Sequence, residues 1–365
     1  MDIDFADLLM EVVSRRASDL HLSAGAHPTV RVRGRLHPIE DYPTLSDTDT
    51  REIVYSILNS DQRQRLETDW QLDFAYSIPG HARFRVNAYY QRGAIGAAFR
   101  LIPVNLSSID ELGLPKTVHE FTRKPRGLVL VTGPTGSGKS TSLAAMIDQI
   151  NRTREEHIMT IEDPIEFLHA HKKCLVNQRE LGSDAQSFSE ALKAALRQDP
   201  DVILVGEMRD LETIATALTA AETGHLVFAT LHTQDTAQTI DRVIDVFPAH
   251  QQGQVRVQLS VALQGIMTQQ LLPTADGSGR VVACEVLVPN PAVRNLIREG
   301  KTHQIYSVLQ TGTAAGMNTM DSSLAMLVRQ DKITRKLAEA RSSTPEELGR
   351  LLGAESLVIG EQAAA

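Results

Sequence analysis

The sequence has little cysteine: only Cys174 and Cys284 occur in 365 residues. The two lie far apart and form no C-x-x-C pair, which excludes a disulfide scaffold and a four-cysteine zinc site. A chain this poor in cysteine is typical of a reducing compartment. We therefore expect a cytoplasmic protein.

Long apolar runs and a strong positive charge are also lacking. No apolar stretch approaches the roughly 20 residues that a helix needs to cross a bilayer. The first residues, MDIDFADLLMEVV, are acidic and lack the basic segment of a signal peptide. The formal net charge is -8, so no overall basic field favours nucleic acid. We predict a globular protein with no direct membrane insertion and no nucleic-acid partner.

Residues 1–103 are expected to form a small α+β domain of PAS-like type. Apolar residues from Phe5 to Val13 follow the i, i+3, i+4, i+7 spacing of an amphipathic helix. Ser46 and Asp49 form a capping-box pattern at the start of a second helix. The intervening and following segments alternate as strands. These segments are SDLHLS, TVRVRGRLHPI, LDFAYSI, RFRVNAYYQ and AIGAAFRLI.

A different pattern begins after residues 104–115, which have few large apolar side chains between two prolines and are predicted to be a linker. In 116–353, apolar strands alternate with helical stretches, which predicts an α/β domain with a mainly parallel sheet covered on both faces. Beyond residue 235 the chain is expected to be mostly helical. We expect the tail, 354–365, to be disordered.

The segment GPTGSGKS, residues 133–140, matches the phosphate-loop pattern G-x-x-x-x-G-K-[ST] in full. Its glycines let successive backbone N–H groups point at phosphates, Lys139 adds positive charge, and Ser140 offers a hydroxyl to Mg²⁺. A chance glycine-rich turn is a weak alternative, because a strand precedes the loop and a helix follows it. The predicted nucleotide-binding residues are Gly133, Pro134, Thr135, Gly136, Ser137, Gly138, Lys139, Ser140 and Thr141.

Two acidic segments are expected beside this loop. The strand-like residues 202–205 deliver Glu207 to the carboxyl edge of the sheet, where ligands bind in open α/β folds. There its carboxylate could hold Mg²⁺ through water or orient a water molecule; a solvated strand-end acid is the alternative. In TIEDPIEF, the acids Glu162, Asp163 and Glu166 would repel one another unless a cation lies near. A helix N-terminus decorated with acids explains Glu162 or Asp163, but not the whole cluster.

The segment GHLVFATLHT places His225 and His232 at the two ends of a predicted strand. Because seven positions separate them, a regular strand directs them to opposite faces, and a shared metal would require a bend. His232 ends the strand at the edge that should also receive Glu207 and the phosphate loop. A hydrogen-bonded packing role is the alternative, and it is the stronger one for His225.

Four segments resemble motifs of the secretion ATPases, the ring motors of type II secretion and type IV pili. In chain order, GPTGSGKST resembles their Walker A, TIEDPIEF their Asp box, DPDVILVGEMRD their Walker B and GHLVFATLHT their His box. The resemblance implies a RecA-like core that hydrolyses ATP with Mg²⁺ and assembles as a homohexamer. It also implies a role in sensing the nucleotide for His232 and, more weakly, for His225. Complete Walker motifs disfavour a non-catalytic adaptor, and the acidic balance disfavours a RecA-like nucleic-acid motor, although a local basic pore lining stays possible.

Further segments resemble the pilus retraction ATPases within that family: ASDLHLSAG, RFRVNAYYQRGAIGAAFRLIP, GMNTMDSSLA and AVRNLIREGK. In the last, Val293 replaces the isoleucine of the family motif and removes one methylene. The resemblance implies that ATP-driven domain rotation acts on the platform protein of the inner membrane, from a peripheral position on its cytoplasmic face, to power twitching motility. Extension and type II secretion ATPases carry extra N-terminal domains and usually a four-cysteine zinc subdomain. We expect neither here, because the sequence begins at the single N-terminal domain and has only two cysteines. A paralogous accessory retraction ATPase is left open, as the protein itself or as a partner.

The resemblance also suggests roles for individual residues. We predict Glu166 as the general base and Glu207 on hydrated Mg²⁺, although spacing alone does not separate the two roles. Arg83, Arg85 and Arg100 are candidate arginine fingers; alternation puts Arg83 and Arg85 on one strand face. A solvated strand face is the ordinary alternative.

The motif associated with retraction supplies Arg294, Asn295, Arg298 and Glu299. On a helix Arg294 and Arg298 lie one turn apart, where they could engage an acidic partner. An exposed, capped helix without a partner is the alternative.

Overall fold

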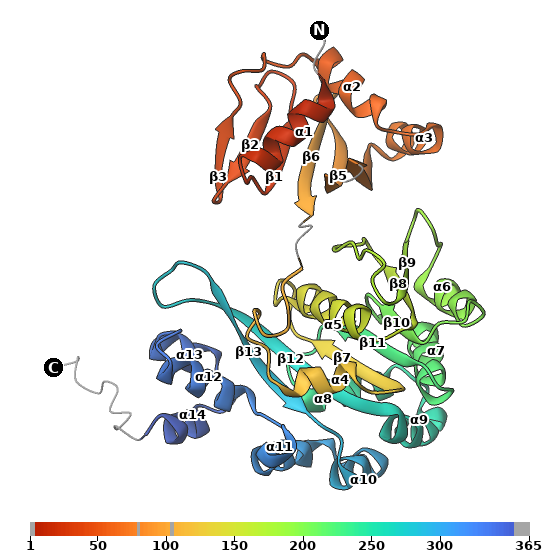
Figure 1. The fold of residues 1–365 in the computed structure, drawn as a ribbon, viewed down its shortest axis with the longest axis vertical. Helices are drawn as coiled ribbons and strands as arrows, with labels where there is room; N and C mark the ends of the chain where they lie inside the picture. Colours follow the sequence, from red (N-terminus) through yellow and green to blue (C-terminus); the bar gives the residue numbers. More distant parts are fainter. Residues whose placement is uncertain (1–3, 79–80, 103–105, 354–365) are drawn as a thin grey trace, which may run out of the picture. The chain divides into compact units, whose positions relative to one another are not determined.

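The computed structural model describes residues 4–78, 81–102 and 106–353. The chain divides into two compact units, the first comprising Met1–Asn105 with Glu166–Leu168 and the second the remainder (Figure 1). Each unit has its own hydrophobic core. Within the described residues, no helix is long and apolar enough to span a membrane.

The first unit is an antiparallel sheet of six strands with the order β3-β2-β1-β6-β5-β4. One face packs against helices through alternate strand residues such as Leu20, Phe84 and Phe99, which confirms the expected α+β arrangement. The strands are β1 (Asp19–Leu22), β2 (Thr29–Val32), β3 (Arg35–Pro38), β4 (Gln71–Ile78), β5 (Ala82–Gln91) and β6 (Ala94–Ile102). The helices are α1 (Phe5–Ser14), α2 (Asp47–Ser56) and α3 (Ser60–Asp69).

Two helix starts in this unit follow from local chemistry. The capping box of Ser46 and Asp49 is present in full at the start of α2, as its spacing predicts. Asn59 and Gln62 form a second box that begins α3, a helix the sequence pattern did not indicate. Only Leu66 of α3 is buried, so the helix carries no apolar periodicity to detect.

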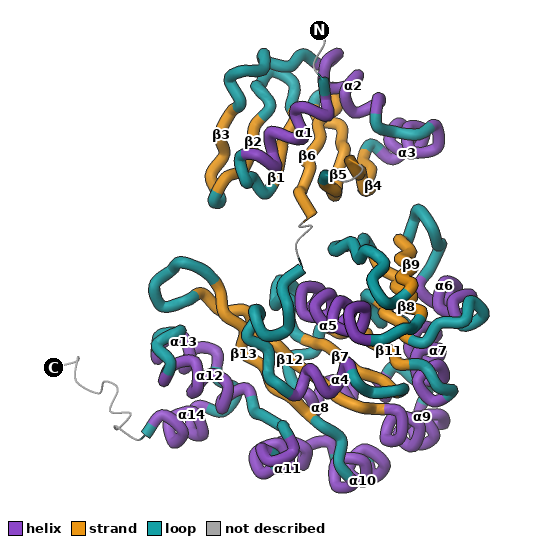
Figure 2. Tube along the Cα trace, viewed as in Figure 1, coloured by secondary structure: helices purple, strands orange, loops and turns teal. Residues whose placement is uncertain are grey.

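The second unit is built on seven strands in the order β13-β12-β7-β11-β10-β8-β9, where β12 is Leu263–Pro273 and β13 is Arg280–Leu287 (Figure 2). Each pair from β12 to β9 is parallel, and β13 is antiparallel to β12. Both faces are buried, since Leu128 and Leu130 pack on one side and Val129 and Val131 on the other. The first five strands along the chain are β7 (Gly127–Thr132), β8 (His157–Glu162), β9 (Leu175–Glu180), β10 (Val202–Val205) and β11 (Leu226–Leu231).

Helices cover the two faces of this sheet unequally, as the core clusters show. One face is covered by α4 (Thr117–Thr122) and α5 (Lys139–Thr153). The other is covered by α6 (Phe188–Ala195), α7 (Leu211–Glu222), α8 (Thr236–Asp245), α9 (Ala249–Ala262), α10 (Pro291–Glu299) and α11 (Ile305–Thr311). Short 3₁₀ turns occupy Thr302–Gln304 and Thr313–Ala315.

The region beyond residue 235 is less helical than predicted. A long hairpin of β12 (Leu263–Pro273) and β13 (Arg280–Leu287) extends the sheet, with β12 pairing parallel to β7. Glutamines interrupt the apolar alternation of β12, so its strand character depends on pairing with β7. Three helices then pack on the hairpin and fit the prediction of a helical C-terminal part. They are α12 (Met320–Arg329), α13 (Arg335–Arg341) and α14 (Pro345–Leu352).

The described part of the predicted linker, 106–115, contains neither helix nor strand and groups with the second unit. Ile109 and Leu114 are buried in the core there, on the face that α4 and α5 cover. Two well-placed apolar residues are enough to anchor such a segment, although its composition is that of a linker. The predicted disordered tail, 354–365, lies outside the described residues.

Candidate active site

The phosphate loop connects β7, which ends at Thr132, to α5, which begins at Lys139. Gly133, Gly136 and Gly138 have φ of 136°, 78° and 89°, values that favour glycine. A Cβ atom on Gly133 would lie 2.3 Å from the carbonyl oxygen of Gln269, so only glycine fits this position. The loop conformation therefore depends on the glycines that define the motif.

The charge and donors of the loop suit an anion. Gly138, the N-cap of α5, has no side chain to satisfy the first-turn N–H groups, which leaves them for phosphate oxygens. Lys139 Nζ lies 2.8 Å from the carbonyl oxygen of Gly133 and 3.1 Å from that of Pro134, on the inside of the loop. Ser140 follows in the first turn of α5. These residues fit a nucleotide phosphate with its metal ion.

Gln269 of β12 supports the loop and is a residue that sequence reasoning missed. Its side chain is fully buried, and Nε2 donates a hydrogen bond to the carbonyl oxygen of Ser137 at 2.7 Å. It stands 132 positions away from Ser137 along the chain. No local motif could reveal it, because the contact exists only once β12 pairs with β7.

The Gln269→Leu substitution is expected to raise KM for ATP by roughly tenfold. A leucine of similar size would leave the buried Ser137 carbonyl without a partner, which costs about 1–3 kcal/mol, so the loop would be less well ordered for binding. Steady-state ATPase kinetics would measure the change. Gln270→Leu, next along β12, is the control, and an unchanged KM in Gln269→Leu would contradict the supporting role.

Glu207 and His232 meet at the carboxyl edge of the parallel sheet. They follow the adjacent strands β10 and β11, which pair in register at Val205 and Ala229. Glu207 Oε1 lies 2.9 Å from Nε2 of His232 and 2.6 Å from Nε of Arg209. Sequence reasoning placed Glu207 and His232 at this edge, but it did not single out Arg209.

Glu207 is held in its ionised form by these neighbours. Its side chain is only 19% exposed, and this partial burial by itself would raise the pKa of the carboxyl group. The hydrogen bond and charge of Arg209, together with His232, outweigh burial and place the pKa of Glu207 below its usual value. A charged, oriented carboxylate at this edge suits a magnesium shell or a water molecule.

His225 lies just before the first residue of β11, at the opposite end of the strand from His232. Its Nδ1 is 3.0 Å from the carbonyl oxygen of Ala220 and ties the start of the strand to α7. The structure therefore does not bring the two histidines together. Among the residues that the structure describes, no cluster of three or more His, Cys, Asp or Glu side chains could hold a metal ion. A catalytic role for His225 stays a prediction, and the contact observed for it is structural.

The acidic segment after β8 divides between the two units. Glu162 ends β8, and its Oε1 accepts hydrogen bonds from Thr160 at 2.6 Å and from Gln178 at 3.1 Å. Asp163 and Glu166 are exposed. Glu166 groups with the first unit, as do the two residues after it. The predicted division of roles between Glu166 and Glu207 stays a prediction.

The three candidate finger arginines lie on the open face of the first unit's sheet. Arg83 and Arg85 alternate with the buried residues Phe84 and Val86. Arg85 and Arg100 are cross-strand partners on β5 and β6. The strand register thus places Arg100 on the same face of the sheet as Arg83 and Arg85, the two residues that alternation predicts to share a face.

Neighbouring residues hold two of these arginines. Arg100 Nε lies 2.9 Å from Oδ1 of Asp19, and its side chain stays 72% exposed. Arg83 Nη1 lies 3.4 Å from Oγ of Ser77. The arginines form a cationic face suited to an anion, and their action as fingers stays a prediction.

The structure corrects the expectation that Arg294 and Arg298 share one partner-binding surface. Arg294 is half-buried and donates to three carbonyl oxygens at the end of α9, those of Ser260, Val261 at 2.9 Å and Leu263 at 3.2 Å. Burial lowers the pKa of the Arg294 guanidinium. Free carbonyls at a helix C-terminus attract a cation, so this side chain fastens α10 to α9.

The other three motif residues are exposed on α10. Asn295 Nδ2 lies 2.8 Å from Oε1 of Glu299, and Arg298 Nη2 lies 3.3 Å from Oδ1 of Asn295. Glu299 also pairs with Lys301 at 2.7 Å. This surface carries both charge signs, so it lacks the purely basic character expected for an acidic partner.

The chain resembles known proteins in sequence and in fold. A family model described as type II/IV secretion system protein matches residues 3–340. The type IV pilus retractation ATPase PilT of Pseudomonas aeruginosa is 53% identical over 344 residues, 94% of this chain and 99% of that protein. A twitching motility protein of Neisseria gonorrhoeae is 54% identical over 321 residues, 88% of this chain and 86% of that protein.

The fold comparison agrees with the sequence comparison. A crystal structure of the pilus retraction motor PilT with bound ADP superposes with a TM-score of 0.90 at 51% identity. The match covers 96% of this chain and 100% of that one. It includes both units and the phosphate loop, so the similarity is not confined to a common nucleotide-binding core. The chain therefore belongs to the type II/IV secretion system protein family, as an ATPase of its pilus retraction branch.

Proposed function

We propose that this chain uses Mg-ATP hydrolysis to retract type IV pili, as a homohexameric motor in the cytoplasm at the inner face of the cytoplasmic membrane. The observation that carries the proposal is the 2.9 Å contact between Glu207 and His232 at the carboxyl edge of the sheet. It joins the Walker B acid to the His box in a chain that matches retraction ATPases over nearly its whole length.

At the nucleotide, each residue has a distinct task. Lys139 and the N–H groups of the loop bind the phosphates, and the hydroxyl of Ser140 with the carboxylate of Glu207, through water, would hold Mg²⁺. When bound there, Mg²⁺ would neutralise charge on the phosphate oxygens. Glu166 accepts the proton of the attacking water. His232 orients Glu207, whose carboxylate its Nε2 contacts at 2.9 Å, and senses the nucleotide state through that contact.

The arginine face of the first unit supplies the positive charge that the transferred phosphoryl group needs. Arg83, Arg85 and Arg100 approach the nucleotide when ATP closes the two units, and they withdraw when products leave. An arginine finger in the correct place is worth about 10³- to 10⁵-fold in rate. Closure that depends on ATP thus links hydrolysis to rotation of one unit against the other.

The rotation is passed to the platform protein of the inner membrane. Asn295, Arg298 and Glu299 are exposed on α10 and are the residues proposed to contact a partner. Arg294 acts differently, since it fastens α10 to α9 and keeps that surface in place. A paralogous retraction ATPase is a second candidate partner.

Complementation of a host strain that lacks the chain tests this function. Loss of the protein is expected to increase the number of surface pili and to abolish twitching, because pili extend but do not retract. The wild-type chain should restore both, and Glu207→Gln should restore neither. Unchanged pilus number and motility in the deletion strain would disprove retraction, and native mass spectrometry that shows only monomer with ATP and Mg²⁺ would disprove the ring.

A further inference from the structure

The backbone on both sides of Glu166 is anchored by two side chains of one strand. The N–H of Ile165 donates to Oε2 of Glu180 at 3.0 Å, and the N–H of His169 donates to Oε1 of Gln178 at 2.8 Å. Gln178 and Glu180 alternate along β9 and therefore point to the same face. Between these two anchors lie only three residues, Glu166–Leu168. The position of Glu166 is thus set by its neighbours in the chain.

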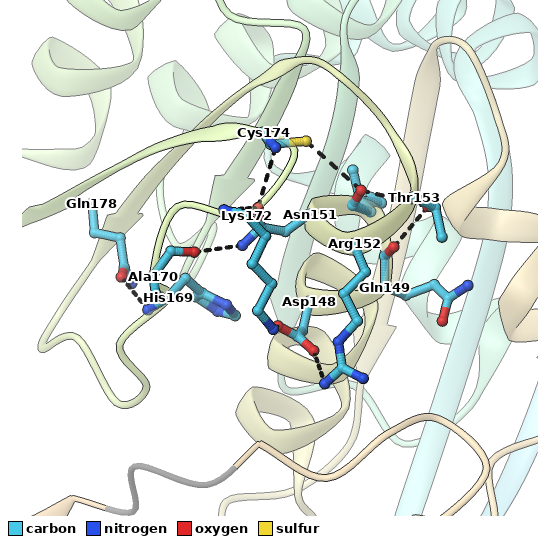
Figure 3. Close-up of polar contacts among 11 residues, drawn as sticks. Asp148, Gln149, Asn151, Arg152, Thr153, His169, Ala170, Lys172, Cys174 and Gln178 are labelled. Atoms are coloured by element: carbon cyan, nitrogen blue, oxygen red, sulfur yellow. Dashed lines mark hydrogen bonds and ion pairs between the residues drawn. The ribbon is translucent and has the colours of Figure 1, made fainter.

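The same segment is then fastened to α5, the helix that follows the phosphate loop (Figure 3). Asn151 of α5 is fully buried. Its Oδ1 accepts from the N–H of Lys172 at 3.1 Å and of Cys174 at 3.3 Å, and its Nδ2 donates to the carbonyl oxygen of Ala170 at 2.7 Å. The Asn151 side chain thus satisfies three backbone groups of this irregular segment, which would otherwise need water as their hydrogen-bond partner.

An ion pair adds to this attachment one turn earlier in α5. The carboxylate of Asp148 is only 5% exposed and pairs with Nζ of Lys172 and with Nη2 of Arg152 (Figure 3). Arg152 belongs to α5 itself, whereas Lys172 comes from the segment that carries Glu166. A carboxylate so buried needs its cations, because an unpaired buried charge is strongly unfavourable. The Lys172 pair is therefore a further contact between α5 and the segment.

We propose that Asp148, Asn151 and Lys172 are positioning residues for hydrolysis, because they hold the Glu166 segment to the helix that begins at Lys139. This inference rests on the proposed role of Glu166 as the general base. Helix α5 is 15 residues long, about 22 Å at the helical rise. It therefore holds the segment bound to Asp148 and Asn151 at a set distance from the phosphate loop. All three lie outside the phosphate loop, residues 133–140. They act through Glu166, whose side chain is exposed.

The test is Lys172→Met, which keeps most of the side-chain length and removes the charge. We expect kcat for ATP hydrolysis to fall about 10- to 100-fold, the effect of displacing a catalytic group by about 1 Å, with KM for ATP unchanged. Lys172→Arg should restore kcat, since it restores the cation. Lys173→Met, at the exposed neighbour, is the matched control and should keep wild-type kinetics. A rise in KM with kcat unchanged, or equal losses in Lys172→Met and Lys173→Met, would overturn the proposal.

A double-mutant cycle separates this inference from the role of Glu166. If Lys172 acts through Glu166, then Lys172→Met should lower kcat no further in a Glu166→Gln chain. If Glu166→Gln lowers kcat and Lys172→Met multiplies that loss, the positioning role is wrong and the base assignment stands. If Glu166→Gln alone hydrolyses ATP at the wild-type rate, the base assignment is wrong. Thermal unfolding of each variant is the control for stability. A melting temperature close to that of the wild type would show that the loss of kcat does not come from unfolding.

Discussion

Lys139→Ala is expected to lower kcat/KM for ATP by at least about 10²-fold, the cost of removing one preorganised charge from a developing anion. Lys139 Nζ is held inside the phosphate loop, 2.8 Å from the carbonyl oxygen of Gly133, so its charge is in place before nucleotide arrives. Alanine removes that charge and leaves the loop glycines unchanged. Steady-state ATPase assays and equilibrium binding of ATP would measure the effect on turnover and affinity.

The matched control for this variant is Lys336→Ala, an exposed lysine of α13 in the same unit. Its removal changes the net charge equally and should leave kcat and KM at wild-type values. If Lys139→Ala retained substantial ATP turnover, the assignment of residues 133–140 as the phosphate site would have to be abandoned.

Glu207→Gln is expected to lower kcat by about 10²- to 10³-fold and to raise the Mg²⁺ concentration needed for half-maximal rate. Glutamine keeps the size of the side chain and can still accept a hydrogen bond from Arg209. Glutamine lacks the negative charge that Arg209 and His232 stabilise in Glu207. A hydrated metal ion requires that charge. ATPase rates measured over a Mg²⁺ titration would show both changes.

Two further variants serve as comparisons for Glu207→Gln. Glu212→Gln removes an exposed acid of α7, paired with Lys193, and should leave the rate and the Mg²⁺ dependence unchanged. Glu166→Gln should lower kcat without changing the Mg²⁺ dependence, because a general base acts on water and not on the metal. The opposite pattern, with Mg²⁺ dependence altered in Glu166→Gln and not in Glu207→Gln, would reverse the two assignments.

The parts of the site that sequence predicts are those whose chemistry is local. The glycines, Lys139 and Ser140 lie within one loop, and their spacing alone requires a turn of donors before a helix. The four apolar residues of β10 likewise imply a buried strand, and a buried parallel strand ends at the edge where ligands bind. From this it follows that Glu207 lies at the same edge of the sheet as the loop.

The parts that sequence did not predict depend on contacts between distant segments. Gln269 reaches the phosphate loop because β12 pairs with β7, and Arg294 is occupied because α10 packs against α9. Both side chains look ordinary in their own segments. The spacing of Arg294 and Arg298 correctly indicates one helical face, but it carries no information on what lies against that face.

By itself, the sequence of this protein determined its two-part organisation, the phosphate loop, and the acid and histidine that end two strands at the same edge of the sheet. These features follow from periodicity and from residues within a few positions of one another. Only the tertiary structure decided that β12 and β13 complete the sheet and that Asp148 and Asn151 hold the segment of Glu166. Such contacts depend on burial and pairing between segments far apart in the chain, and no local pattern of side chains encodes them.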